Sequence, residues 1–217
     1  MEPTATAAGS RIYNRQLLSI YDVGVHGISN KLFWRCPTER IIGFYGRHLA
    51  RRHLDIGVAT GFILDQAIPP GATPQLTLMD LNENCLYAAA ERLAPFRPAL
   101  VKADVLRPLP LRPASFDSIG LGYLLHCLPG TLREKGAAFA ELRTLLAPGG
   151  VVFGSTILGG LPGLPAPTRR LMDFYNSKGI FSNQRDTPEL LEAALATHFS
   201  SHSVELIGCV ALFAGYA

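Results

Sequence analysis

Three aspartates each stand at the end of a short apolar run: Asp55 in RRHLD, Asp80 in QLTLMD and Asp104 in ALVKAD. A carboxylate accepts hydrogen bonds from hydroxyl and amine groups, and it can also orient an ammonium group. Two glycines, Gly57 and Gly61, follow the first aspartate. Glycine allows positive φ angles and a close approach of the backbone to a ligand. This combination predicts a binding site for a nucleotide-like molecule.

Such a site needs elements that bring the three aspartates together. Short apolar runs alternate with helical patterns along the chain, in HLDIGV, QLTLMD, ALVKAD, FDSIGLGYLL and VVFGSTIL. This alternation is typical of a parallel sheet covered by helices on both faces. The last two runs, SVELIG and CVALFAGY, predict a hairpin that adds an antiparallel strand. We therefore expect an α/β fold with a Rossmann-like, doubly wound, seven-stranded and mostly parallel sheet.

The segment before the first predicted strand is aromatic and helical in character. We expect residues 1–50 to form a helical N-terminal cap of the same domain, and residues 51–217 to form the Rossmann-like core. Further along the chain, TLREKGAAFAELRTLLA predicts one helix that ends at Pro148-Gly149-Gly150. Residues 175–186 are polar and contain glycine, which predicts either a loop over a substrate or an ordinary surface loop.

Composition excludes several functional classes. The 217 residues carry a net charge of +3 with no run of basic residues, which argues against nucleic acid as a partner. Four widely separated cysteines argue against a zinc site or a disulfide framework, and they fit a reducing, cytoplasmic location. No cluster of carboxylates stands out as a magnesium site, so we expect no metal. The N-terminus lacks the features of a signal peptide. No apolar run reaches the ~18 residues that a membrane span needs, so no membrane association is expected.

The aspartates have structural as well as functional interpretations. In open parallel sheets, ligands bind beyond the carboxyl ends of the strands, where the strand order reverses. Asp80 can accept hydrogen bonds from ribose hydroxyls there, or it can cap the next helix, which Asn82 would do better. Asp104 can accept from an exocyclic adenine amine, or it can be a solvated carboxylate of a turn. Both interpretations of Asp104 stay open at this point.

The motifs resemble a known family. The stretches LDIGVATG, MDLN, ADVLRPLP, FDSIGLGYLLHCLPG and LLAPGGVVFGSTIL are similar to those of class I S-adenosylmethionine-dependent methyltransferases that act on small molecules. The resemblance covers roughly residues 51–158 and the closing strand pair. The family usually has a third glycine in its first motif, and this chain has Ala59 there. Alanine is the smallest replacement, so we expect slightly less room and retained binding.

The resemblance implies a position for each part of the cofactor. The methionine part would lie against the glycine turn, the ribose against the second strand, the adenine after the third strand, and the amino-acid portion also close to the backbone that ends the fourth strand. The residues concerned are, in that order, Asp55, Gly57, Ala59, Thr60 and Gly61; Asp80 and Leu81; Asp104 and Val105; Leu121, Gly122 and Tyr123.

Charge and spacing separate the candidate cofactors. A dinucleotide places its pyrophosphate at the helix N-terminus and prefers the spacing GxGxxG. Here the spacing from Gly57 to Gly61 is GxxxG, and Asp55 would repel a pyrophosphate but could orient an ammonium group. S-adenosylmethionine is therefore favoured over NAD(P), and an NAD(P)-dependent oxidoreductase becomes the less favoured alternative. A protein that binds S-adenosylmethionine without transferring methyl is a further alternative.

The expected reaction is methyl transfer to a small organic metabolite, with S-adenosylhomocysteine as product. O-methylation is favoured and N- or C-methylation is possible, and the enzyme would be a monomer or homodimer. Aromatic faces stabilise a sulfonium cation, which makes Tyr13, Tyr21 and Trp34 candidates, with core packing as their alternative. A histidine can take the acceptor's proton, and His126 is the first candidate and His26 the second. A buried, hydrogen-bonded His126 is the alternative.

Overall fold

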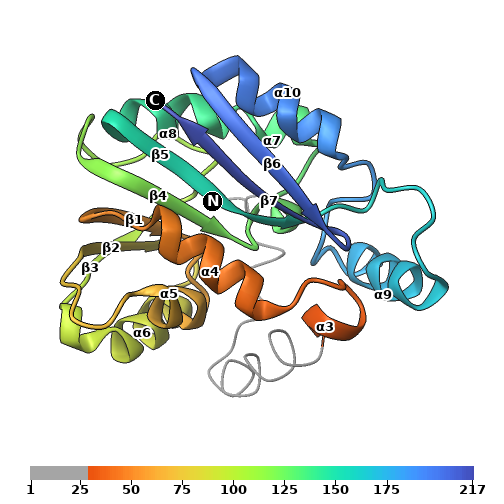
Figure 1. Ribbon diagram of the computed structural model, residues 1–217, viewed down its shortest axis with the longest axis horizontal. Helices are drawn as coiled ribbons and strands as arrows, with labels where there is room; N and C mark the ends of the chain where they lie inside the picture. Colours follow the sequence, from red (N-terminus) through yellow and green to blue (C-terminus); the bar gives the residue numbers. More distant parts are fainter. Residues whose placement is uncertain (1–28) are drawn as a thin grey trace, which may run out of the picture.

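The computed structural model describes residues 29–217 of the chain. A seven-stranded sheet with the order β3-β2-β1-β4-β5-β7-β6 forms the centre of the molecule (Figure 1). Strands β1 to β5 run parallel, while β7 pairs antiparallel with both β5 and β6. This confirms the predicted Rossmann-like sheet with its C-terminal hairpin. The strands are β1 (Arg52–Ile56), β2 (Gln75–Asp80), β3 (Ala99–Lys102), β4 (Phe116–Gly122), β5 (Leu146–Ile157), β6 (Ser201–Ile207) and β7 (Val210–Tyr216).

Helices cover both faces of the sheet. Figure 1 shows α4, α5 and α6 grouped on one side of the sheet, with α8 and α10 on the other. The α-helices are α3 (Asn30–Leu32), α4 (Thr38–His48), α5 (Phe62–Ala67), α6 (Glu83–Arg92), α7 (Leu132–Lys135), α8 (Ala138–Leu145), α9 (Ala166–Ser177) and α10 (Pro188–His198), and the 3₁₀-helices are η2 (Ala94–Phe96) and η3 (Leu125–Cys127). Within residues 29–217, none of these helices is long and apolar enough to cross a membrane.

Strand β1 shows how side-chain alternation divides the core. Leu54 and Ile56 point to one face and join the apolar cluster that includes Phe139 of α8. His53 and Asp55 point to the opposite face, under α4. Successive side chains of a strand alternate between faces, so β1 presents an apolar side and a polar side. The polar side brings chemistry-bearing groups to the face that α4 covers.

One prediction about the helices was wrong. The expected single helix over TLREKGAAFAELRTLLA is two helices, α7 and α8, which are interrupted at Gly136. A Cβ atom on Gly136 would lie 2.8 Å from the Cβ atom of Ala194, so the break lets α10 approach closely. The second helix also ends early, because Leu146 already pairs with Phe116 of β4. Tertiary contacts decided both boundaries.

The strand order places a site at one end of the sheet. Strands β1 and β4 are neighbours, β2 and β3 extend the sheet in one direction, and β5 extends it in the other. The connections after β1 and β4 therefore lead away from each other and leave a crevice at their carboxyl ends. The three predicted aspartates lie at or just after the ends of β1, β2 and β3.

Candidate active site

A pocket lies at the carboxyl ends of β1, β2 and β4 and beside the segment after β3; we call it the strand-end pocket. It brings together most of the residues that the sequence predicts for a cofactor site. Those that line it are Asp55, Gly57, Ala59, Thr60, Gly61, Asp80, Leu81, Asp104, Val105, Gly122 and Tyr123. Residues that are far apart in the sequence thus share one cavity, as the topology requires.

The glycine turn forms the wall of the pocket between β1 and α5. Gly57 and Gly61 both have φ +71°, a conformation that other residues adopt only with strain. A Cβ atom on Gly57 would lie 2.7 Å from Cδ1 of Leu124, and one on Gly61 would lie 3.1 Å from Cβ of Ala89. The turn therefore needs glycine for its conformation and also for its close contacts. Nε of Arg92 on α6 donates to the carbonyl of Thr60 at 2.8 Å and helps to fix the turn.

Ala59 adopts a left-handed backbone conformation with φ +48°. Glycine would reach this conformation without strain, which explains physically why the resembled family prefers glycine here. The backbone amide of Ala59 also makes a hydrogen bond to the carboxylate of Asp80. The backbone amide of Ala59 thus connects the glycine turn to the carboxylate at the end of β2.

Asp80 presents a half-buried carboxylate at the end of β2. Its Oδ1 accepts a hydrogen bond from the backbone amide of Asn82 at 2.8 Å. Burial raises the pKa of Asp80 to about 6, although hydrogen bonds from the backbone of Asn82, Ala59 and Leu81 lower it. The side chain of Asn82, and not that of Asp80, caps α6 by accepting from the amide of Asn84. The helix-cap interpretation of Asp80 is therefore wrong.

Asp104 lines the pocket with a side chain that is only 7% exposed. Its Oδ1 accepts from the backbone amide of Leu106 at 3.0 Å, and its Oδ2 lies 3.9 Å from Nε of Arg107. The interpretation of Asp104 as a solvated turn carboxylate does not fit this burial. A buried carboxylate next to a cavity can accept from a ligand donor such as an exocyclic amine.

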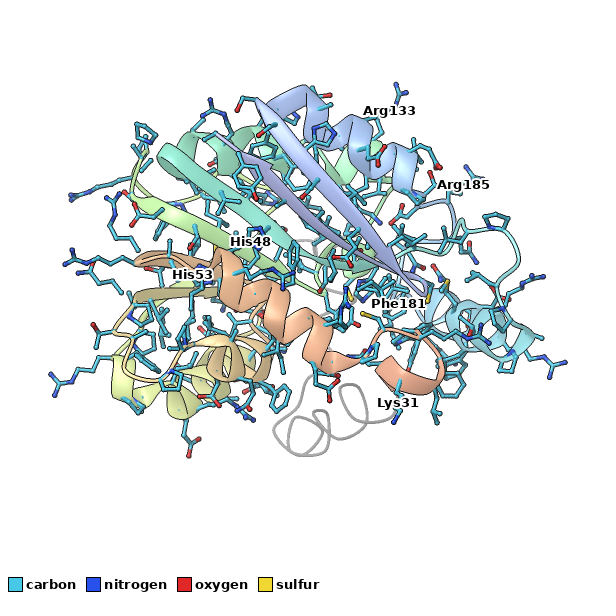
Figure 2. The ribbon with its side chains drawn as sticks, in the orientation of Figure 1. Lys31, His48, His53, Arg133, Phe181 and Arg185 are labelled. Carbon is cyan, nitrogen blue, oxygen red and sulfur yellow. The ribbon has the colours of Figure 1, made fainter. Side chains whose placement is uncertain are left out.

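Asp55 lines the pocket and is 5% exposed. Its Oδ1 accepts a hydrogen bond from the hydroxyl of Tyr45 on α4 at 3.2 Å, and it lies 3.8 Å from Nε2 of His53. Burial raises the pKa of Tyr45 well above its usual value, and the nearby charge of Asp55 raises it further. Tyr45 therefore stays protonated and donates to Asp55. Figure 2 shows His53 on β1 next to α4, which carries His48.

Several predicted residues are elsewhere. Trp34 is 2% exposed and packs against Phe181 and Tyr175, with ring centroids 6.0 and 6.5 Å away, and it does not line the pocket. Leu121 is not among the residues that line the pocket, and its side chain points into the core on the other face of β4. The prediction for Leu121 concerned its backbone and stays a prediction. Trp34 thus follows the core-packing interpretation. The predictions for Tyr13, Tyr21 and His26 fall outside the described residues.

His126 is 3% exposed and lies beside the pocket, not in its lining. Its Nδ1 accepts a hydrogen bond from the backbone amide of Ile157 at 3.3 Å. The centroid of its ring lies 4.5 Å from that of Phe181. Burial lowers the pKa of His126 to about 3, and the Lys135 ammonium lowers it further. With Nδ1 already accepting, the neutral ring carries its proton on Nε2. The predicted role of proton acceptor does not fit this geometry.

The segment after α9 is held to the protein by hydrogen bonds. The amide of Ser182 donates to the carbonyl of His126 at 2.8 Å, and Nδ2 of Asn183 donates to the carbonyl of Ile157 at 2.9 Å. Phe181, labelled in Figure 2, lies near the carboxyl end of β6, where the hairpin turns into β7. These two hydrogen bonds connect the segment to His126, which follows β4, and to Ile157, the last residue of β5.

Sequence reasoning missed other residues of the pocket lining. Those that follow the glycine turn are continuous with a predicted motif, so their position could have been inferred. Leu124, Cys127 and Leu128 lie within the quoted stretch FDSIGLGYLLHCLPG, so their position could also have been inferred. Tyr45 gave no such signal, because a helical position alone does not reveal which cavity a side chain meets. The missed residues are Tyr45, Ile56, Phe62, Ile63, Leu64, Cys85, Ala103, Leu124, Cys127 and Leu128.

The arrangement offers specific chemistry to a ligand. Three carboxylates, from the ends of three strands, line a mainly apolar pocket, and they can accept from donors such as an ammonium group, a ribose diol or an adenine amine. In the part of the chain that the structure describes, no group of three or more His, Cys, Asp or Glu side chains could hold a metal ion.

Comparisons with known proteins agree with this geometry. Residues 54–152 match a family described as methyltransferase domain. The chain is 40% identical over 205 residues to demethylluteothin O-methyltransferase from Streptomyces thioluteus, covering 94% of this chain and 89% of that protein. It is 37% identical over 218 residues to the physcion biosynthesis cluster O-methyltransferase from Aspergillus chevalieri, covering 97% and 95%.

A solved structure shares the fold. The phosphoethanolamine N-methyltransferase 2 of Haemonchus contortus, solved with phosphomonomethylethanolamine and S-adenosylhomocysteine, superposes with a TM-score of 0.67 at 21% identity. The alignment covers 94% of this chain and 47% of that longer protein. At this identity the likeness concerns the fold alone.

Proposed function

Because this chain belongs to the class I S-adenosylmethionine-dependent methyltransferases, we propose that it transfers a methyl group to a hydroxyl oxygen of a small organic metabolite of secondary metabolism. The observation that carries this proposal is the strand-end pocket, where Asp55, Asp80 and Asp104 meet beside the glycine turn. The cofactor is S-adenosylmethionine, and S-adenosylhomocysteine is the product that leaves the pocket.

The residues of the pocket fit this cofactor. Asp55 would hold the ammonium group of its methionine part, and the glycine turn would follow the same part along the backbone. Asp80 would accept from the ribose hydroxyls, and Asp104 from the adenine amine. When bound, the cofactor supplies a methyl group on a sulfonium centre, which an acceptor atom attacks in line as the thioether leaves.

The chain contributes mainly position and exclusion of water. Methyl transfer needs the acceptor oxygen in line with the bond that breaks, so fixing both molecules removes most of the entropic barrier. Apolar groups such as Leu124, Leu128 and Val105 line the pocket and keep water from its interior. The backbone of Gly122 and Tyr123 lies where β4 ends and would border the reacting groups.

The names of the similar proteins favour oxygen as the acceptor atom. Both curated relatives described above are named O-methyltransferases, and this chain spans nearly their whole length. Buried His126, with Nδ1 engaged by Ile157, is a poor proton acceptor. An acceptor whose hydroxyl is itself acidic, such as a phenol or an enol, needs no strong base. We therefore propose this class of substrate.

We further propose that the enzyme works without a metal or nucleic acid, in the cytoplasm, as a monomer or homodimer. Residues 1–50 would form a cap of the same domain and residues 51–217 the catalytic core. Retained activity in excess chelator supports the first statement. Size-exclusion chromatography with light scattering determines the oligomeric state, and a tetramer would contradict it.

Methyl transfer can be tested with isotope-labelled cofactor. The purified chain is incubated with S-adenosylmethionine carrying a ¹³C methyl group and a panel of hydroxylated aromatic or pyrone acceptors. We expect an O-methyl resonance in one product and stoichiometric S-adenosylhomocysteine. Label on nitrogen or carbon would contradict the oxygen assignment, and a rearranged acceptor with unconsumed cofactor would contradict transfer. The variant Asp55→Asn is the control, and its rate should fall.

A further inference from the structure

Asp55 belongs to a buried network that the cofactor roles above do not explain. The hydroxyl of Tyr45 donates to its Oδ1 at 3.2 Å, and Nε2 of His53 lies 3.8 Å from the same oxygen. Tyr45 and His53 are fully or almost fully buried. These two groups come from α4 and β1, so the network joins the helix before the first strand to the lining of the pocket.

Two glycines of β4 leave room for this network. A Cβ atom on Gly120 would lie 2.6 Å from Oδ1 of Asp55 and 3.0 Å from the hydroxyl oxygen of Tyr45. A Cβ atom on Gly122 would lie 2.7 Å from the same hydroxyl oxygen. Neither glycine has a positive φ, so backbone conformation does not require glycine at these positions. The two glycines of FDSIGLG are therefore explained by the space that Asp55 and Tyr45 occupy next to β4.

The hydrogen bonds around His53 indicate where its proton is. The hydroxyl of Ser118 accepts from the amide of Ala50 at 2.9 Å and lies 2.8 Å from Nδ1 of His53. The serine proton can then be donated to Nδ1, which leaves the ring proton on Nε2, toward Asp55. In the described part of the chain, Nε2 of His53 is the one buried side-chain nitrogen or oxygen without a hydrogen-bond partner. At 3.8 Å, it is just beyond hydrogen-bond distance of the carboxylate.

We propose that Tyr45 and His53 are positioning residues that hold the carboxylate of Asp55 for the ammonium group of the cofactor. Tyr45 fixes Oδ1 in place, and His53 offers a second donor that a small shift of the carboxylate on binding would engage. The backbone of Gly122 in turn makes a hydrogen bond to the Tyr45 hydroxyl. This inference rests on the proposed function, because it assigns the ammonium group of S-adenosylmethionine to Asp55.

The test compares two ligands, of which one carries the amino-acid part with its ammonium group and the other lacks that whole part. S-adenosylhomocysteine carries the amino-acid part, whereas 5′-methylthioadenosine has the same adenosine and thioether without it. Both are titrated calorimetrically into the full chain and into Tyr45→Phe. We expect Tyr45→Phe to bind S-adenosylhomocysteine about tenfold more weakly, the effect of one lost hydrogen bond to a charged group. Its affinity for 5′-methylthioadenosine should stay within about twofold.

Two further variants show whether Tyr45 acts through Asp55. In the Asp55→Asn background, Tyr45→Phe should cause little additional loss, because its partner charge is already gone. Tyr216→Phe is the matched control, since it removes a tyrosine hydroxyl that contacts His48 at 3.2 Å, away from Asp55. It should leave both affinities unchanged. His53→Asn, which removes the donor on the Nε2 side, should show the same ligand selectivity as Tyr45→Phe.

The outcomes separate this inference from the proposed function. Equal weakening of both ligands by Tyr45→Phe, or full additivity with Asp55→Asn, would overturn the positioning role and leave the cofactor assignment intact. Unchanged affinity for S-adenosylhomocysteine would do the same. Failure of the unaltered chain to bind S-adenosylhomocysteine at all would overturn the proposed function and this inference together.

Discussion

The ammonium group of Lys135 on α7 lies 2.8 Å from Oδ2 of Asp186, and both side chains are almost fully buried. Lys135 also donates to the backbone carbonyl of Ser182. Burial lowers the pKa of Lys135 and raises that of Asp186, and each partner opposes the shift of the other. The pair fastens the segment after α9 to the residues that follow β4.

Removing one partner of this pair should be strongly destabilising. We expect Lys135→Met to lower the free energy of unfolding by about 3–5 kcal/mol, because it leaves the Asp186 carboxylate buried without its counter-charge. The double variant Lys135→Met/Asp186→Leu should regain much of that loss. Chemical denaturation of the three proteins measures both effects. A single variant as stable as the unaltered chain would show that the pair is not buried in solution.

Cofactor affinity should depend on pH through Asp80. Its raised pKa, about 6, means that the carboxylate is protonated below this pH and ionised above it. The ionised form accepts ribose hydrogen bonds better, so the affinity for S-adenosylhomocysteine should fall as the pH decreases from 7 to 5. Calorimetric titration across this range measures the effect. Asp80→Asn should bind more weakly at pH 7 and lose most of this dependence, and a parallel curve for the variant would remove Asp80 from the site.

We expect His126 to affect the pH dependence of protein stability and not the proton transfer that accompanies methylation. Its pKa falls from 6.5 to about 3 on folding, so the unfolded chain binds a proton below pH 6.5 that the folded chain does not. This group should therefore reduce stability as pH decreases from 6.5 toward 3, by at most about 1.4 kcal/mol per pH unit. Denaturant unfolding of the unaltered chain and His126→Asn at pH 7 and pH 5 measures this contribution, which the variant should lack.

The rate of methyl transfer gives an independent measurement on the same residue. Between pH 6 and pH 9, the pH profiles of the unaltered chain and His126→Asn should have the same shape, even where the variant is slower. A rate that loses an ionisation near neutral pH in the variant would show that His126 accepts the proton after all.

Ala59→Gly should stabilise the protein. Alanine pays about 1–2 kcal/mol for a left-handed conformation, and glycine avoids this at the cost of a more flexible unfolded chain. We expect a net gain of up to about 1 kcal/mol in the free energy of unfolding. The control is Ala88→Gly inside α6, where the same substitution should cost about 1 kcal/mol. Thermal or chemical unfolding compares them, and a loss at both positions would contradict the strain at Ala59.

Much of the fold followed from local pattern. Apolar runs that end in Asp55, Asp80 and Asp104 predicted parallel strands, and parallel strands bring their carboxyl ends to one edge of a sheet. The glycine turn needed no tertiary information either, because Gly57 and Gly61 signal backbone conformations that other residues avoid. For these features, the sequence alone predicts the element and its end of the sheet.

The tertiary structure decided which buried groups meet. Periodicity shows that a side chain is buried, but several faces bury side chains, and sequence does not say which of them adjoin. It could not show that Trp34 packs on Phe181 away from the pocket, or that Nδ1 of His126 accepts from Ile157. Nor could it bring Tyr45 to Asp55 across the space that Gly120 leaves. Strand order and helix packing determine these contacts, because they join elements that are distant along the chain.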